Sequence, residues 1–197
     1  MKIVKTLLII VAVLAGAFII WNATLPANFE VKRSVNMNVA PEAISHTVSD
    51  FSTWPHWSVW FQLDSTMTYE LGDTHQGVGG SYSWTSEAMG GGNMSILEYT
   101  EGQSMKTEIH FDGQGMSNGS WDFEIQNNGE TKVTWGLSGE MGFFGRFIGA
   151  QMDKWVGPDF EAGLQNLKSY VESAAVAAEA AAESEANIAS SDSLLID

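Results

Sequence analysis

The sequence predicts an α+β protein, in which a curved antiparallel sheet of about seven strands wraps around one long C-terminal helix. Three features lead to this prediction. An uncharged apolar run occupies the N-terminus, short stretches of alternating apolar and polar residues fill the middle, and a long stretch with helical periodicity follows. Sheet and helix each have one apolar face, and packing these faces together buries both.

The N-terminal segment predicts one transmembrane helix. No charged side chain occurs from Thr6 to Phe29, and most of this stretch is Leu, Ile, Val, Ala and Phe. A bilayer core about 30 Å thick needs about 20 apolar residues, so the run is long enough. Lys2 and Lys5 precede it and are expected to stay in the cytoplasm, which places the rest of the chain on the outer (periplasmic or extracellular) side.

A cleaved signal peptide is the alternative for this segment, because it also has a basic start and an apolar core. Ala15-Gly16-Ala17 is similar to a small-residue cleavage site, but the apolar run continues through Phe18 to Trp21. Cleavage there would leave an apolar new terminus. We therefore expect residues 1–25 to be a retained anchor.

The composition excludes several classes of function. The chain has no cysteine, which removes disulfides, thiol nucleophiles and zinc–thiolate sites. The net charge is −15, and of the nine Lys and Arg residues Lys2 and Lys5 precede the apolar run, which leaves seven scattered over the rest. Nucleic acids need clustered cations, so we expect no nucleic-acid partner. The four histidines are not at metal-ligand spacing, and we expect no metal and no cofactor.

A strand and two short helices are expected after a linker from Asn22 to Asn28. Apolar and polar residues alternate from Phe29 to Val39, as in a half-buried strand. Arg33 lies on its apolar side, where it would pair with an internal carboxylate or a ligand carboxylate; a bulge would instead expose it. Ala40-Pro41-Glu42 opens the first helix, and residues 50–61, with three tryptophans, form a second short helix or a tight turn.

Further short strands separated by Gly-rich turns complete the sheet. They are expected at residues 66–71, 80–85, 93–100, 104–111, 117–126 and 131–138. Asn127-Asn128-Gly129-Glu130 predicts a hairpin between the last two. Alternation places Trp121 and Trp135 on the inward face of these two strands.

The longest helical pattern runs from Gly142 to Glu172 and carries a broad apolar stripe. Gly157-Pro158 interrupts it, and we expect a kink or a break there. From Ser173 onward the sequence is rich in Ala, Glu and Ser. We expect residues 26–172 to form the folded domain, and residues 173–197 to form an acidic tail that is helical at first and disordered at its end.

Several strings in this order resemble the SRPBCC (Bet v 1/START-like) superfamily, which includes the polyketide cyclase/dehydrase and lipid transport family, and most of all its membrane-anchored bacterial members. They are Val31 to Ser34, Val48 to Ser58, Gly77-Val78-Gly79 with Tyr82-Ser83-Trp84, Lys132 to Trp135, and Gly157 to Glu161. The resemblance covers residues 29–172. It implies a helix-grip fold whose cavity takes an apolar or amphipathic ligand. It implies no single chemistry, because the superfamily includes carriers, cyclases, dehydratases and hydrolases.

The aromatic residues are the candidate lining of that cavity, since small-molecule pockets are mostly apolar and aromatic. The alternative for each ring is an ordinary core position. The candidate cavity residues are Arg33, Trp54, Trp57, Trp60, Tyr82, Trp84, Trp121, Trp135, Phe147 and Met152. His56, which lies between two tryptophans, is a candidate acid or base at a pocket mouth, with a surface or capping role as its alternative.

The sequence therefore predicts a membrane-anchored protein that binds a hydrophobic or lipid-like small molecule and has no catalysis of its own. Two alternatives stay open. One is an enzyme of the cyclase, dehydratase or hydrolase type that uses the same cavity, although we expect no nucleophile elbow. The other is an interaction module for a membrane partner, which a solid core and an exposed apolar patch would favour.

Overall fold

The computed structural model describes residues 2–193, with side chains up to Ala186. The end of the predicted tail, residues 194–197, lies outside this range. The first elements are helix α1 (Lys2–Ala23), strand β1 (Asn28–Met37), helix α2 (Pro41–Ser49), the 3₁₀ helix η1 (Phe51–His56) and helix α3 (Trp60–Leu63). The strands β2 (Thr68–Leu71), β3 (Ser81–Thr85), β4 (Gly92–Thr100), β5 (Ser104–Phe111), β6 (Gly115–Ile125) and β7 (Thr131–Glu140) follow. The chain continues with η2 (Phe143–Gly145), α4 (Arg146–Gly149) and α5 (Met152–Ser193).

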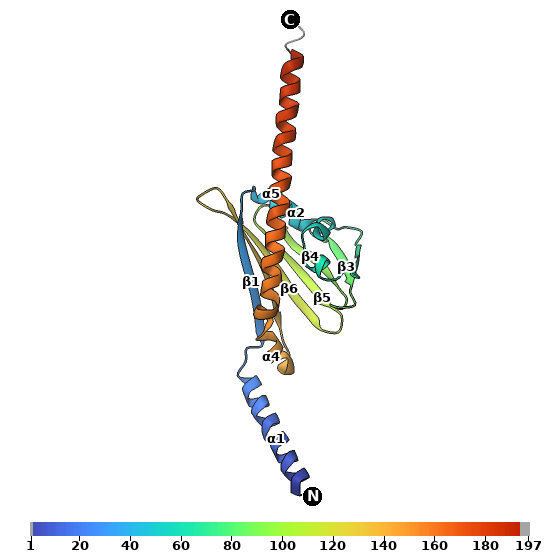
Figure 1. The fold of residues 1–197 in the computed structure, drawn as a ribbon, viewed down its shortest axis with the longest axis vertical. Helices are drawn as coiled ribbons and strands as arrows, with labels where there is room; N and C mark the ends of the chain where they lie inside the picture. The colour runs from blue at the N-terminus through green and yellow to red at the C-terminus, as the bar shows by residue number, and fades with distance from the viewer. Residues whose placement is uncertain (1, 194–197) are drawn as a thin grey trace.

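The seven strands form one antiparallel sheet in the order β1-β7-β6-β5-β4-β3-β2. After β1 the chain crosses to the far edge through α2, η1 and α3, and then returns strand by strand until β7 pairs with β1 (Figure 1). Helix α5 lies across one face of this curved sheet (Figure 1). The α+β helix-grip architecture predicted from the sequence is confirmed.

Helix α5 packs against the sheet through an apolar stripe at a spacing of three to four residues, as in an amphipathic helix. The stripe consists of Phe160, Leu164, Leu167 and Val171, each at most 4% exposed. Gly163 lets the helix approach closely, because a Cβ atom there would lie 2.9 Å from Cζ3 of Trp135. Helix and sheet are therefore in direct contact at this point.

The sequence predicted a kink or a break at Gly157-Pro158. A break there is wrong, because α5 runs from Met152 through both residues to Ser193. The helical pattern is interrupted earlier, at the turn residues Ala150 and Gln151 between α4 and α5. Gly157 has a different role. A Cβ atom there would overlap the guanidinium group of Arg33, so the glycine makes room for a side chain from the sheet.

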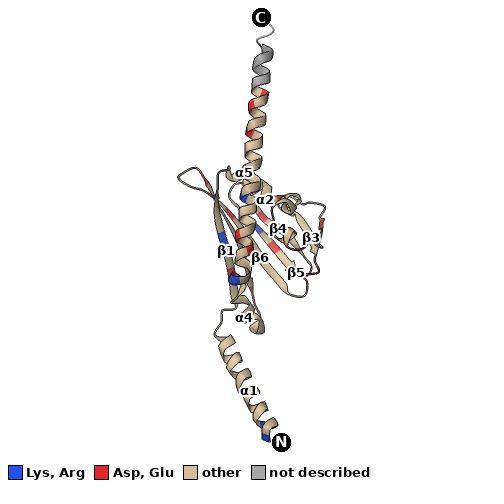
Figure 2. Ribbon diagram, viewed as in Figure 1, with Lys and Arg blue, Asp and Glu red and all other residues tan. Residues whose placement is uncertain are grey.

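Helix α1 and the C-terminal part of α5 extend from opposite ends of the domain (Figure 1). Helix α1 is long and apolar enough to cross a membrane, and signal sequences share these properties. Its two lysines lie at its free end, whereas acidic residues occur along the distal part of α5 (Figure 2). The 42 residues of α5 correspond to a length of about 63 Å.

Candidate functional site

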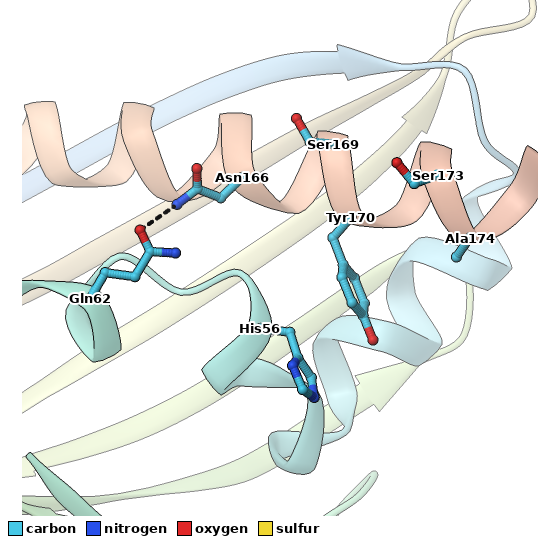
Figure 3. Close-up of a pocket in the computed structure, with 7 residues that line it drawn as sticks. All are labelled: His56, Gln62, Asn166, Ser169, Tyr170, Ser173 and Ala174. Carbon is cyan, nitrogen blue, oxygen red and sulfur yellow. Dashed lines mark hydrogen bonds between the residues drawn. The ribbon is translucent and has the colours of Figure 1, made fainter. Parts of the chain in front are cut away.

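An open groove separates α5 from the segment formed by η1 and α3 (Figure 3). Its volume is about 570 Å³, within the range of about 300–1,000 Å³ that is typical of small-molecule sites. The lining residues are His56, Gln62, Asn166, Ser169, Tyr170, Ser173 and Ala174. The groove lies where α5 meets the short helices η1 and α3, and side-chain contacts connect these elements there.

The lining of the groove is neutral and amphipathic. The rings of His56 and Tyr170 are parallel within 5°, with centroids 5.8 Å apart. The amide of Asn166 donates to Oε1 of Gln62 at 3.4 Å. Two serine hydroxyls complete the polar part of the wall. Flat rings and uncharged donors and acceptors suit an uncharged ligand that has both polar and apolar parts.

Local structure explains why His56 faces the groove. In η1 and the residue after it, Trp54 and Trp57 point into the core and are 1% and 0% exposed. His56 lies between them in the sequence and is exposed on the opposite side. The structure thus places this histidine at the mouth of a groove, the setting in which the sequence made it a candidate acid or base.

The buried tryptophans form a tightly packed cluster with Phe160 of α5. Trp121 stacks on Trp135 at 4.6 Å, and Trp135 stacks on Phe160 of α5 at 4.0 Å. Trp54 lies 4.9 Å from Trp57. These five residues, Trp54, Trp57, Trp121, Trp135 and Phe160, are called the aromatic cluster below. The cluster stabilises the contact between sheet and helix, and its role as a ligand-cavity wall stays a prediction.

The indole N–H groups of the two η1-region tryptophans bond within the protein. Nε1 of Trp54 donates to the carbonyl of Val48 at 2.9 Å, and Nε1 of Trp57 donates to Oγ1 of Thr53 at 3.3 Å. Buried indoles need such partners. These two indoles therefore offer a ligand ring faces rather than free donors.

The other predicted aromatic residues extend the cluster to its sides. Tyr82 packs 5.9 Å from Trp54, and burial raises the pKa of its hydroxyl. Trp84 lies 5.6 Å from Tyr82 and is half-buried. Trp60, also half-buried, contacts Phe160 at 6.3 Å. The structure thus brings seven of the predicted residues to one region: Trp54, Trp57, Trp60, Tyr82, Trp84, Trp121 and Trp135.

Arg33 lies apart from this cluster and joins β1 to α5. Its Nε donates to Oε1 of Glu161 at 2.6 Å, and an Nη atom donates to Oδ1 of Asp153 at 2.7 Å. These hydrogen bonds raise the pKa of the guanidinium group, and the bond from Arg33 lowers the pKa of Asp153. The pairing of β1 with β7 is uninterrupted, so Arg33 faces α5 as its alternation predicts, and the bulge alternative is wrong.

The partners of Arg33 have a recognisable spacing in the sequence. Asp153, Gly157 and Glu161 follow one another at four-residue intervals, which places them on one face of a helix. Two carboxylates on either side of a glycine leave a space that fits a guanidinium group. This pattern would have identified the ion pairs from the sequence.

Phe147 and Met152 lie at the other end of the domain from the groove. Phe147 of α4 is 37% exposed and contacts Phe18 of α1, with ring centroids 6.0 Å apart. Met152, the first residue of α5, is half-buried against the core. The structure does not bring Phe147 to the aromatic cluster.

The two long edges of α5 are held differently. Along β1, besides Arg33, the amine of Lys168 donates to the carbonyl of Asn36 at 2.6 Å, and the backbone N–H of Asn38 donates to Glu172 at 2.9 Å. Along η1 and α3, the groove residues contribute the hydrogen bond between Asn166 and Gln62 and the ring stack described above. Charged hydrogen bonds are stronger than neutral ones, so the β1 edge is the firmer of the two.

The residues of α5 that line the groove also follow a pattern that the sequence reasoning missed. Asn166, Ser169, Tyr170 and Ser173 recur at helical spacing beside the apolar stripe. A polar stripe next to an apolar one marks the boundary of the buried face. Its partner His56 comes from a distant segment, so the groove itself needs the fold to become visible.

One string, Gly115 to Gly119, has the letters GxSxG. It lies inside β6, where Ser117 pairs with Gly139 of β7 and is 7% exposed. A nucleophile elbow places its serine at a sharp turn from a strand into a helix. Ser117 does not occupy such a turn and is a sheet residue.

The curved sheet that grips a C-terminal helix defines a helix-grip protein of the SRPBCC type. Residues 28–172 match the family described as polyketide cyclase / dehydrase and lipid transport, and the chain belongs to this family. The family indicates a fold that binds hydrophobic ligands. A search of curated proteins found no match to this sequence.

Solved structures share the fold at low sequence identity. SA2116 of Staphylococcus aureus, a protein of unknown function, has a TM-score of 0.59 and 11% identity over 75% of this chain and 96% of its own. CV1439 of Chromobacterium violaceum has a TM-score of 0.54 and 14% identity over 73% and 96%. Ara h 8.0201 has a TM-score of 0.51 and 11% identity over 74% and 99%. These similarities show the fold alone.

Proposed function

We propose that this chain is a membrane-anchored binding protein for an uncharged hydrophobic or lipid-like small molecule. The ligand enters between α5 and the η1–α3 segment and is held against the aromatic cluster. The observation that carries this proposal is the open groove of about 570 Å³ at the weaker edge of α5. A helix held firmly along β1 can separate from η1 and α3 without losing its charged hydrogen bonds.

The chemistry of the groove supports an uncharged ligand. The protein has a net charge of −15, which disfavours the approach of anions. Among the seven lining residues, His56 is the one histidine, the side chain that most often serves as a general acid or base. The groove does not combine it with a carboxylate, so its chemistry favours binding over acid–base catalysis.

The tether supports a ligand that is stored in a membrane. If α1 is retained as a transmembrane helix, only residues 24–27 separate it from β1. The basic N-terminus then lies in the cytoplasm, and the domain lies on the outer side. A domain held this close to lipid meets apolar molecules at a high effective concentration.

Native mass spectrometry of the full chain, taken from membranes into polymer-bounded lipid discs, tests the proposal. Ser169→Trp fills the groove, while Gln165→Trp places the same side chain one turn earlier on α5, at an exposed position that does not line the groove. We expect a co-purified apolar molecule on the wild type and on Gln165→Trp, and its loss from Ser169→Trp. A ligand-free wild type, or equal occupancy of both variants, would contradict the proposal.

A further inference from the structure

The connection between β7 and α5 exposes a set of large apolar side chains. Phe143, Phe144, Phe147 and Ile148 are 37%, 75%, 37% and 38% exposed; these four residues of η2 and α4 are called the apolar tip. Arg146 is the one charged side chain from Met141 to Met152. Contiguous exposed apolar groups on a folded domain mark a surface that another phase or molecule covers.

The apolar tip is attached to the side of α1. The rings of Phe147 and Phe18 are 6.0 Å apart. The amide of Asn22 donates to the carbonyl of Phe143. Arg146 donates to the carbonyl of Leu25 at 3.4 Å. These contacts involve the last two turns of α1 and the residues just after it, so the tip lies against the C-terminal end of this helix.

The position of Phe18 sets the depth of the apolar tip. The midpoint of α1 lies between Ala12 and Val13, and Phe18 is about 8 Å from it at about 1.5 Å per residue. If α1 crosses a bilayer symmetrically, the hydrocarbon extends about 15 Å to each side of this midpoint. Phe18 then lies inside the hydrocarbon, and Phe147, which contacts it, lies there too.

The side chains around the tip fit the headgroup boundary. On the same scale Trp21 lies about 13 Å from the midpoint, where amphipathic rings are favoured. The guanidinium group of Arg146 lies 5.5 Å from the ring centroid of Phe143 and reaches the carbonyl of Leu25, just after α1. A basic side chain there can direct its charge toward lipid headgroups while its stem covers apolar surface.

We infer that the apolar tip inserts into the hydrocarbon of the leaflet from which α1 emerges, as a second membrane contact of the domain. This inference rests on the part of the proposed function in which α1 spans the bilayer. Two contacts fix the orientation of the domain, with the start of α5 at the membrane. Tyr170 in the groove then lies about 27 Å farther along α5, on the side away from the lipid.

Spin labels test this inference on the full chain, because the protein has no cysteine and any single introduced cysteine is labelled alone. Phe144→Cys reports on the tip. Ile125→Cys, 69% exposed at the opposite end of β6, is the control for water, and Leu14→Cys, 65% exposed in α1, is the control for lipid. The labelled proteins are placed in phosphatidylcholine–phosphatidylglycerol vesicles, and collision with oxygen and with a water-soluble nickel chelate is measured.

We expect the label at residue 144 to behave like that at residue 14, with strong oxygen and weak nickel collisions, and the label at residue 125 to show the reverse. A label at residue 144 that behaves like residue 125 would overturn the inference and leave the anchor intact. Weak collisions with both reagents would mean coverage by protein and would also overturn it. Water-like behaviour at residue 14 would remove the anchor itself, and with it both proposals.

Discussion

The two long edges of α5 differ in chemistry. One edge holds the helix on the sheet, and the other is the edge at which we propose that the helix opens. The β1 edge carries charged hydrogen bonds from Arg33 and Lys168 and to Glu172. The groove edge carries a 3.4 Å amide hydrogen bond and a pair of stacked rings. Below both edges the aromatic cluster joins helix and sheet. We therefore regard the β1 edge as the hinge and the groove edge as the opening.

The largest loss of stability is expected from removal of the Trp135 ring, which belongs to the aromatic cluster below both edges. Trp135 stacks between Trp121 and Phe160, so Trp135→Ala should destabilise the domain by about 3–5 kcal/mol. Trp155→Ala, at a 55% exposed position, should cost less than about 0.5 kcal/mol. Chemical unfolding in mild detergent measures both, and similar losses for the two variants would mean that the cluster is not a packed core.

A side chain at Gly163 should push α5 away from the sheet. A Cβ atom there already lies 2.9 Å from Trp135, and the stacked neighbours of that ring prevent it from moving aside. Gly163→Leu should cost about 1–3 kcal/mol, as overpacking typically does. The same unfolding assay checks this value. Unchanged stability would show that helix and sheet have free space between them at this point.

Loss of the hinge contacts should make stability less sensitive to acid. The bond from Arg33 lowers the pKa of Asp153 below its ordinary value of 3.8. A lowered pKa in the folded state stabilises the protein above the ordinary value, and this contribution is lost as the pH falls through the lowered one. Arg33→Gln should lower the melting temperature at neutral pH and reduce its dependence on pH below about 4.

The matched control for the hinge is Lys32→Gln, which removes the neighbouring and more exposed pair with Glu30. Exposed pairs contribute little to stability, so this variant should melt close to the wild type. Melting curves recorded between neutral and acidic pH compare the two variants. Equal melting temperatures for both at neutral pH would mean that Arg33 does not hold α5.

The smallest effect on stability is expected at the opening edge. Asn166→Ala removes a partly exposed amide hydrogen bond of 3.4 Å, which at this length contributes less than about 0.5 kcal/mol. Hydrogen exchange of η1 and α3 should nevertheless become faster, because these elements lose a contact with α5. Faster hydrogen exchange along β1 instead would mean that α5 opens at the β1 edge, and it would contradict an opening at the groove.

Sequence patterns predicted the sheet well because each strand repeats a simple alternation that depends on neighbours in the chain. They also placed Arg33 toward α5. They did not place the helix break correctly, because Gly157 is adapted to a distant arginine rather than to a bend. Phe147 lies within the helical pattern predicted from Gly142 to Glu172, yet the turn at Ala150 and Gln151 separates α4 from α5, and Phe147 contacts α1 instead. The groove combines segments distant in the sequence, which no local pattern reveals.

The most direct test of the account is the distance across each edge of α5 with and without ligand. One pair of spin labels at Leu63→Cys and Gln165→Cys spans the groove from two exposed positions that do not line it, and a second pair at Ser34→Cys and Gln165→Cys spans the β1 edge. Double electron–electron resonance is measured on the full chain with its co-purified ligand and after delipidation in detergent. We predict a changed distance across the groove and a constant distance across the β1 edge. Constant distances across both edges would contradict an opening at the groove.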